Sequence, residues 1–76
     1  MVDYRFSKNP ESFRPAVIVR VVNAKDNVVN LQVFSDGDND VAIAPDANAN
    51  EGTLWRTSVE YSDDAVAGTW GWPLRV

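Results

Sequence analysis

Hydrophobic and polar residues along this chain alternate in short runs that predict β-strands. Residues 16–22, Ala-Val-Ile-Val-Arg-Val-Val, are dense in β-branched side chains and predict a central strand that is buried over most of its length. Turn-forming residues follow at 23–27, after which Val29, Leu31 and Val33 alternate with other residues. The two runs together predict an antiparallel hairpin.

The segments on either side of this hairpin predict shorter elements. Residues 1–15 predict one short strand and a loop, and residues 35–40 predict a turn. A short strand is expected at 41–44, where Pro45 ends it, and an exposed polar loop is expected at 46–52. These segments would connect the longer strands of a small β-rich fold.

The last third of the chain returns to alternation. Residues 53–61 predict a strand whose core face carries Trp55. An acidic loop is expected at 62–68, and the tail at 69–73 is expected to be extended. The chain thus supplies four or five strands and no long helix.

A flat sheet needs other elements, such as helices, to cover both of its faces, and this chain predicts no helices. The sheet must therefore curl on itself. The sequence therefore predicts an all-β fold: a small open barrel of SH3-like or OB-like kind or a curled antiparallel sheet of four to five strands, with a two-layer sandwich as the next alternative. A chain of 76 residues without cysteine has room for one domain, residues 1–76, and no disulfide framework. Open sheet edges predict a homo-oligomer, most simply a dimer.

The residue types that are missing exclude most catalytic chemistry. The chain has no histidine and no cysteine, which removes the commonest general base and the usual zinc ligands. The adjacent acids Asp63 and Asp64 lie in a polar loop, where nothing predicts the burial that an acid catalyst requires. We therefore expect a protein that is not an enzyme and that holds no metal or cofactor.

Charge and hydropathy limit the partners further. Seven basic and eleven acidic residues give a net charge of −4, which opposes non-specific binding to the phosphate backbone of nucleic acids. No apolar run approaches the ~20 residues that cross a bilayer. The first residues also lack the basic flank and apolar run of a signal peptide. We expect a cytoplasmic protein without membrane contact.

Four blocks of the sequence resemble a group of small phage- and prophage-encoded proteins of mostly unassigned function. The blocks are Arg-Pro-Ala-Val-Ile-Val-Arg-Val at 14–21, Val-Asn-Leu-Gln-Val-Phe-Ser-Asp-Gly at 29–37, Leu-Trp-Arg-Thr-Ser-Val at 54–59 and Gly-Thr-Trp-Gly-Trp-Pro at 68–73. In that group the tail tends to read Gly-Thr-Trp-His-Trp-Pro-Glu, so Gly71 stands here in place of the histidine and Leu74 in place of the glutamate. The resemblance implies a viral origin.

Candidate binding residues lie in the tail and around one acidic turn. Trp70 and Trp72 are two residues apart in an extended segment, so their rings project to the same side and either clamp a flat ring or an apolar partner surface or belong to the core. The turn at 36–40 predicts Asx side chains that cap backbone amides, with contact to a polar ligand as the alternative.

Arginines on the predicted strands form the last group of candidates. Arg20 and Arg56 are expected to pair across the sheet with Glu60 or Asp40, or else to grip a ligand phosphate. The full set of predicted ligand- or partner-binding residues is Trp70, Trp72, Arg56, Phe34, Asp36, Asp38, Asn39 and Asp40.

These features favour a non-enzymatic, phage-encoded binding protein that acts in the host cytoplasm. Its partner is expected to be either a small molecule, such as a signalling nucleotide sequestered in counter-defence, or the surface of a host protein. The alternative is a virion or assembly accessory protein, because small acidic β-domains commonly decorate or join phage particles.

Calcium is predicted not to bind the acidic turn. In a calcium loop starting at Asp36, the sixth and twelfth positions require glycine and a bidentate acid, but they are Val41 and Ala47 here. Millimolar calcium should therefore leave the Tm measured by circular dichroism unchanged relative to a control of matched ionic strength. A saturable, calcium-specific rise of several degrees would contradict this prediction, because a ligand that binds the folded state must stabilise it.

Overall fold

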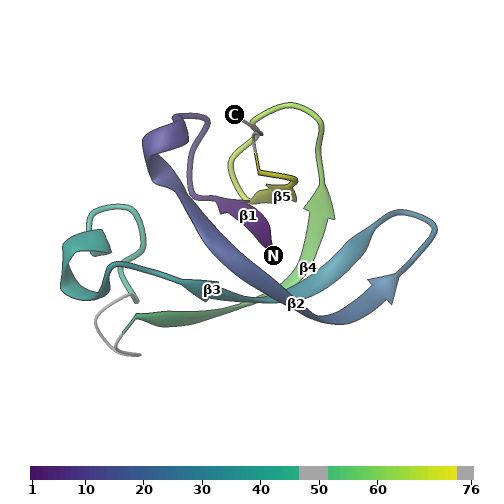
Figure 1. Cartoon of the computed structure of the whole chain (residues 1–76), viewed down its shortest axis with the longest axis horizontal. Helices are drawn as coiled ribbons and strands as arrows, with labels where there is room; N and C mark the ends of the chain where they lie inside the picture. Colours follow the sequence, from purple (N-terminus) through teal and green to yellow (C-terminus); the bar gives the residue numbers. More distant parts are fainter. Residues whose placement is uncertain (47–51, 74–76) are drawn as a thin grey trace.

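The computed structural model is a closed barrel of five strands (Figure 1), and it describes residues 1–46 and 52–73. The strands are β1 (Val2–Arg5), β2 (Phe13–Asn23), β3 (Val28–Phe34), β4 (Thr53–Tyr61) and β5 (Thr69–Gly71). Two short 3-10 turns, η1 (Pro10–Ser12) and η2 (Gly37–Asp40), lie between strands. Within the described residues, no helix is long and apolar enough to cross a membrane.

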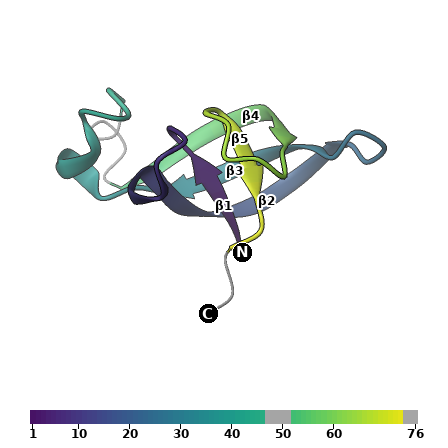
Figure 2. The ribbon, with the colours of Figure 1, turned by 90° about the horizontal axis from the view of Figure 1, so that it is seen from above.

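The sheet follows chain order around the barrel. Each strand pairs antiparallel with the next from β1 to β4, β4 pairs parallel with β5, and β5 closes the ring against β1 (Figure 2). The prediction of a small all-β barrel is confirmed. The sequential strand order differs from the Greek key of an OB-fold, and the barrel is closed where an open one was the first expectation.

The core is filled from alternate positions of the strands. On β3, Val29, Leu31 and Val33 are all buried, as the alternation predicted. The other buried hydrophobic residues of the core are Val2, Tyr4, Ala16, Ala44, Leu54, Val59 and Trp70. This distribution joins all five strands through one interior.

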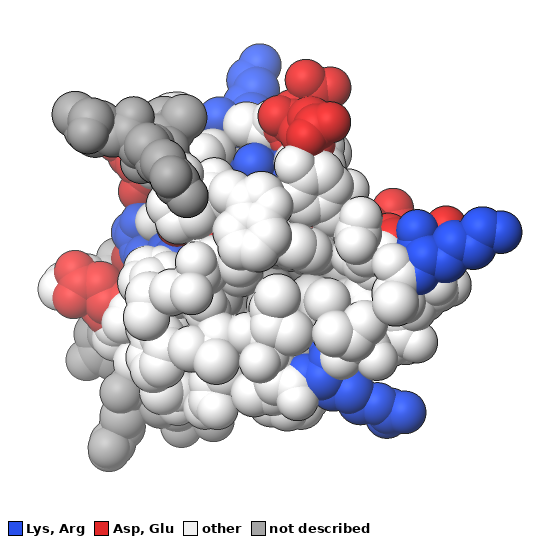
Figure 3. Space-filling model, turned by 45° about the vertical axis from the view of Figure 1, so that its right-hand side comes forward, with Lys and Arg blue, Asp and Glu red and all other residues white. Residues whose placement is uncertain are grey.

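β2 is a strand where the sequence predicted one, but the prediction that it is mostly buried is wrong. Ala16 is buried, whereas Val17, Val19 and Val21 are 40%, 47% and 55% exposed. The reason is that β1 pairs with β2 only as far as Ala16. Beyond that residue β2 pairs with β3 alone, and their hairpin projects from the barrel (Figure 1). Figure 3 brings this side forward and shows a broad uncharged surface with charged side chains at its edges.

β4 has the bounds that the sequence predicted, but the residues that face the core are not the predicted ones. Leu54 and Val59 are both buried although they lie five positions apart, which regular alternation would put on opposite faces, and Trp55 is 55% exposed. The faces exchange at Ser58, which has a φ of 52° and whose N–H donates to Asn30 Oδ1 at 2.9 Å. The β3–β4 pairing shifts register at this bulge. Trp55 is therefore outside the barrel and not in the predicted core.

Residues 41–44 form a turn and not the predicted strand. The N–H groups of Ile43 and Ala44 both donate to the Asp40 carbonyl, at 3.0 Å and 2.8 Å. This turn continues η2 and directs Ala44 into the core, where it is 1% exposed. Of the loop predicted at 46–52, residues 47–51 lie outside the described residues.

A buried arginine ties the closing strand to the rest of the barrel. Arg5 ends β1, is 7% exposed, and its Nη1 lies within hydrogen-bond distance of four oxygens. The shortest contacts are with the carbonyls of Ser62 at 2.7 Å and Asp64 at 3.0 Å, in the loop between β4 and β5. The others are the Thr69 hydroxyl and the Trp70 carbonyl on β5 itself. The guanidinium therefore binds β1, the loop and β5 together.

Gly71 makes room for this guanidinium. A Cβ atom at position 71 would overlap the Arg5 side chain, and Gly71 does not have a positive φ. Glycine is thus required here by the close approach of Arg5 and not by backbone conformation.

Gly71→Ala is predicted to lower the free energy of unfolding by about 1–3 kcal/mol, the usual cost of overpacking. In an Arg5→Met background the same substitution should cost much less, because the guanidinium that the new methyl group meets is absent. Urea unfolding of the four variants of this cycle measures the difference. An equal cost of Gly71→Ala in both backgrounds would show that the Arg5 contact is not the reason for glycine.

Candidate protein-binding face

The two tail tryptophans have different environments. Trp70 lies on β5, is 4% exposed, and its indole N–H donates to the Asn27 carbonyl at 3.0 Å. Its ring also packs edge-on against Tyr61, with 5.0 Å between centroids. Trp70 therefore belongs to the core, which is one of the two roles that the sequence left open.

Trp72 is 63% exposed and packs edge-on against Trp70, with 5.5 Å between centroids. The rings do lie on one side of the chain, but the inner ring is covered. The tail consequently presents one accessible indole and does not form a clamp of two. Of the predicted tail pair, only Trp72 can contact a partner without unpacking the core.

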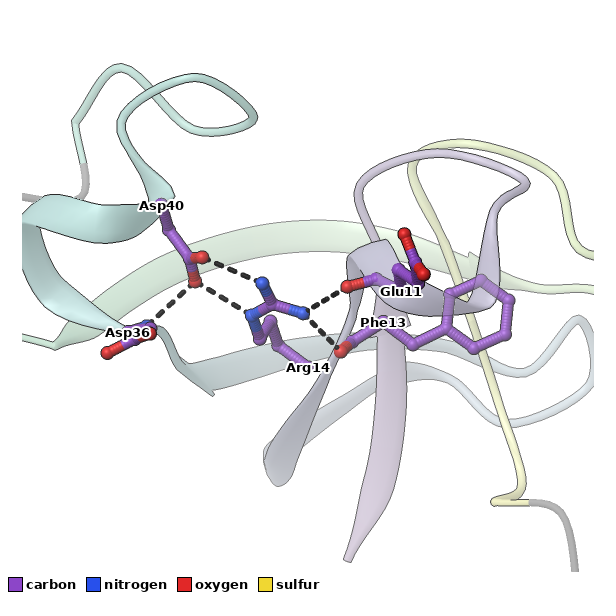
Figure 4. A network of polar contacts seen from close by, with 5 residues as sticks. All are labelled: Glu11, Phe13, Arg14, Asp36 and Asp40. Atoms are coloured by element: carbon purple, nitrogen blue, oxygen red, sulfur yellow. Dashed lines mark hydrogen bonds and ion pairs between the residues drawn. The ribbon is translucent and has the colours of Figure 1, made fainter.

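The acidic turn is held by an ion pair with β2 (Figure 4). The Asp40 carboxylate accepts hydrogen bonds from Arg14 Nε at 2.8 Å and Nη2 at 2.7 Å, and from the Asp36 N–H at 2.7 Å. Arg14 Nη1 donates in turn to the carbonyls of Glu11 and Phe13. These hydrogen bonds from Arg14 hold the pKa of Asp40 below its ordinary value against the opposing effect of burial.

This arrangement confirms the prediction that an Asx side chain of the turn caps a backbone amide, because Asp40 caps Asp36. Asp40 is 3% exposed, and its carboxylate is bound by Arg14 and by the Asp36 N–H, so the residue is covered in this structure. Asp36 and Asn39 are exposed, and Asp38 lies in the same turn. Among the described residues, no three acids are placed to hold a metal ion.

Arg56 forms an ion pair with Asp46 and not with the predicted partners Glu60 or Asp40. It is half-buried and forms an ion pair with Asp46 at 3.0 Å, while its guanidinium lies 5.8 Å from the Tyr4 ring centroid and 5.5 Å from that of Phe6. The hydrogen bonds from Arg56 lower the pKa of Asp46. Arg56 is thus committed to contacts within the chain.

Arg20 is the other arginine that the sequence predicted to pair across the sheet. It is exposed on β2, Arg14 binds the predicted partner Asp40, and no ion pair joins Arg20 to Glu60 in the described part of the chain. The described arginines with buried or half-buried side chains all bind groups of the chain itself.

An exposed hydrophobic surface forms on the outside of β2, β3 and β4. Val17 pairs with Gln32, and Gln32 pairs with Trp55, so these residues form one row across three strands. Phe34 is two positions from Gln32 on β3 and therefore borders the same row. We call these four residues, Val17, Gln32, Phe34 and Trp55, the Trp55 face.

The Trp55 face is accessible and uncharged. Val17 and Phe34 are each 40% exposed and Trp55 is 55% exposed. Their sequence neighbours Ala16, Val33 and Leu54 point into the barrel, and alternation along a strand directs the face outward.

Sequence reasoning named Phe34 as a candidate but missed Val17 and assigned Trp55 to the core. No local signal in the sequence places Trp55 outside, because the bulge that lets Leu54 and Val59 both be buried is seen only in the fold. No protein-family model matches the chain, and no curated protein or solved structure matches it either. The evidence for a binding face is therefore the exposure and the chemistry of the Trp55 face itself.

The Asp40–Arg14 pair predicts how stability responds to acid. Because the pKa of Asp40 is lower in the folded chain than its ordinary value of 3.8, the pair stabilises the fold above that value, and this contribution is lost as the pH falls below it. Asp40→Asn should lower the free energy of unfolding by about 2 kcal/mol near neutral pH and flatten its decline in acid. Urea unfolding at a series of pH values measures both effects, with Asp64→Asn as the exposed control. An unchanged acid slope in Asp40→Asn would refute the assignment.

Proposed function

We propose that this chain is a non-enzymatic, phage-encoded binding protein that acts in the cytoplasm of the infected host cell by occupying the surface of another protein. The single observation that carries the proposal is the Trp55 face, where Trp55 is 55% exposed beside Phe34 and Val17. Exposed apolar patches on small proteins mark interaction sites, and tryptophan is enriched among the residues that dominate binding energy.

The rigidity of the face supports this use. Its residues lie on three paired strands, so binding does not have to order a loop before contacts form. A standard protein interface buries about 800 Å² on each partner. The chain has an accessible surface of 4994 Å², of which such an interface would cover roughly a sixth, so one side of the barrel suffices.

The shape of the surface favours a protein partner over a sequestered nucleotide. Small-molecule sites are concave and enclose most of the ligand. The described residues enclose no pocket, and the Trp55 face is the outside of a sheet. Of the two arginines predicted to grip a phosphate, Arg56 is already paired with Asp46, and Arg20 is exposed on β2, where the described residues form no pocket around it.

A non-enzymatic role is supported by the chemistry that the chain contains. Its sequence has neither histidine nor cysteine. Asp40, the buried carboxylate, is held ionised by Arg14 and is thereby unsuited to act as a general acid. Counter-defence through the blocking of a host protein is consistent with a domain whose accessible chemistry is hydrophobic contact.

Trp55→Lys is predicted to abolish binding of the partner while leaving the fold intact, because the side chain is outside the core. Trp72→Lys is the matched control, since Trp72 is the other exposed tryptophan and follows β5, a strand that carries no residue of the face. Tagged wild-type, Trp55→Lys and Trp72→Lys chains would be purified from infected cells and the retained proteins identified by mass spectrometry. We expect one host protein to be retained by the wild type and the Trp72→Lys chain and lost from the Trp55→Lys chain.

Other outcomes assign the function differently. Retention of the same host protein by a folded Trp55→Lys chain would contradict the proposed face. Loss on Trp72→Lys alone would move the binding site to the tail. Co-purification of particle proteins in place of a host protein would support the role of a virion or assembly accessory. Circular dichroism of each variant shows whether the barrel is preserved.

A further inference from the structure

Arg20 lies on the same side of the sheet as the Trp55 face. Leu31 of β3 points into the barrel, so Asn30 beside it points outward. Arg20 pairs with Asn30, and directly paired residues of antiparallel strands point to the same side. Regular alternation from Ile18, which pairs with Leu31, would turn Arg20 inward, but the register shift between Ile18 and Arg20 reverses it. The guanidinium therefore belongs to the outer surface.

Arg20 is also close to the centre of this surface. Asn30 is two positions from Gln32 on β3, and Gln32 pairs with Trp55. With strands about 4.8 Å apart and a rise of about 3.3 Å per residue, roughly 12 Å of sheet separates the Cα atoms of Arg20 and Trp55. An interface that buries about 800 Å² on each partner has a radius of about 16 Å if it is circular. A partner centred on Trp55 therefore covers Arg20 as well.

The free chain provides no opposite charge for Arg20. Neither of the two ion pairs among the described residues includes it. Its side chain is exposed, so solvent satisfies the guanidinium donors in the free chain. Asn30, which pairs with it on β3, already accepts a hydrogen bond from the Ser58 N–H through Oδ1 at 2.9 Å. A partner that displaces solvent from Arg20 must therefore bring acceptors of its own.

We propose that the partner which covers the Trp55 face presents an aspartate or glutamate carboxylate to the Arg20 guanidinium. This proposal rests on the proposed function and names the chemistry of the partner surface. Covering an arginine without an opposite charge weakens binding, because the lost hydration is not replaced. A carboxylate replaces it best, since its two oxygens accept parallel hydrogen bonds from the planar fork of donors.

Backbone carbonyls alone are a poorer counterpart at this position. Arg5 is bound by carbonyls, but they belong to a loop and a strand of its own chain that surround it inside the barrel. Most carbonyls of a folded partner are already paired within its own secondary structure. A side-chain carboxylate projects from such a surface and reaches the guanidinium across the interface.

The acids on the outer side of the strands leave this position cationic. Glu60 follows Val59 beyond the Ser58 bulge, and Asp3 lies on β1, so both are further from Trp55 than Arg20 is. The chain has a net charge of −4 and repels a strongly acidic protein at long range. The expected partner therefore carries its carboxylate locally, opposite Arg20, and is not required to be acidic overall.

Charge variants of the full chain test the contribution of Arg20 to affinity. The host protein that the wild type retains would be titrated into wild-type, Arg20→Gln, Arg20→Lys and Lys25→Gln chains by isothermal calorimetry. Lys25→Gln is the matched control, because it also removes one positive charge from an exposed residue, in the turn between β2 and β3. Arg20→Gln should raise Kd at least about tenfold and Lys25→Gln less than about twofold. Arg20→Lys should fall between the wild type and Arg20→Gln, because it keeps the charge but not the planar fork.

Carbodiimide coupling tests for the carboxylate itself, because the reagent condenses an amine with a carboxylate to an amide and takes up the water that is lost. In the Arg20→Lys complex, the amine at position 20 should be linked to an aspartate or glutamate of the host protein, and mass spectrometry of the linked peptides identifies both residues. The wild-type complex should give no link at this position, because arginine does not couple. Lys25 is present in both chains and reports non-specific coupling.

The two proposals fail in different ways. Equal affinities of Arg20→Gln and Lys25→Gln, or no link from position 20 in an Arg20→Lys complex that still forms, would overturn the carboxylate contact. If Trp55→Lys still abolishes binding in that case, the Trp55 face stands and only the counterpart of Arg20 is wrong. Retention of the host protein by a folded Trp55→Lys chain, or no retained protein with the wild type, would refute the proposed function, and the carboxylate contact with it.

Discussion

The barrel depends on the burial of the Arg5 guanidinium. β5 is a strand of three residues that pairs with its neighbours at only two positions on each side, so strand pairing alone gives it little support. Arg5 supplies the missing contacts through the carbonyls of the β4–β5 loop and of β5, and it forms no ion pair among the described residues. Burial of a charge is costly unless hydrogen bonds compensate it. Here backbone oxygens lie within hydrogen-bond distance of Nη1, whereas the buried Nε has no hydrogen-bond partner among the described residues. This arrangement requires glycine at position 71, because a Cβ atom there would overlap the Arg5 side chain.

Closure by Arg5 determines which surfaces remain for binding. β1 and β5 cover one side of the interior, and among the described residues Phe34 on β3 and Trp55 on β4 stay exposed on the outside of the barrel. The bulge at Ser58 lets Leu54 and Val59 both fill the core, and it leaves Trp55 outside. Arg14 and Arg56 secure the loops by pairing with Asp40 and Asp46. The Trp55 face keeps hydrophobic side chains exposed, and this exposure supports the binding role proposed for it.

The strands were predictable from the sequence because alternation and turn residues are local signals. β3 and its buried residues follow directly from that pattern. The bulge at Ser58 was not predictable, since a positive φ at serine has no local signature, and one extra residue reverses every side chain beyond it. Arg5 and Asp40 resemble surface charges in the sequence, and their burial depends on loops from distant parts of the chain. Of the candidate site, Phe34 could be anticipated, whereas the sequence left the exposure of Trp72 open and the position of Trp55 required the fold.

The central claim is that Trp55 is open to solvent in the free protein and covered by a partner in the complex. Acrylamide quenching of tryptophan fluorescence in a Trp72→Phe chain tests it most directly, because Trp70 is buried and contributes a nearly constant background. The chain would be measured alone and with the host protein that the wild type retains. The account predicts strong quenching of Trp55 in the free chain and several-fold weaker quenching in the complex. Equal quenching in both states, or a shielded Trp55 in the free chain, would contradict it.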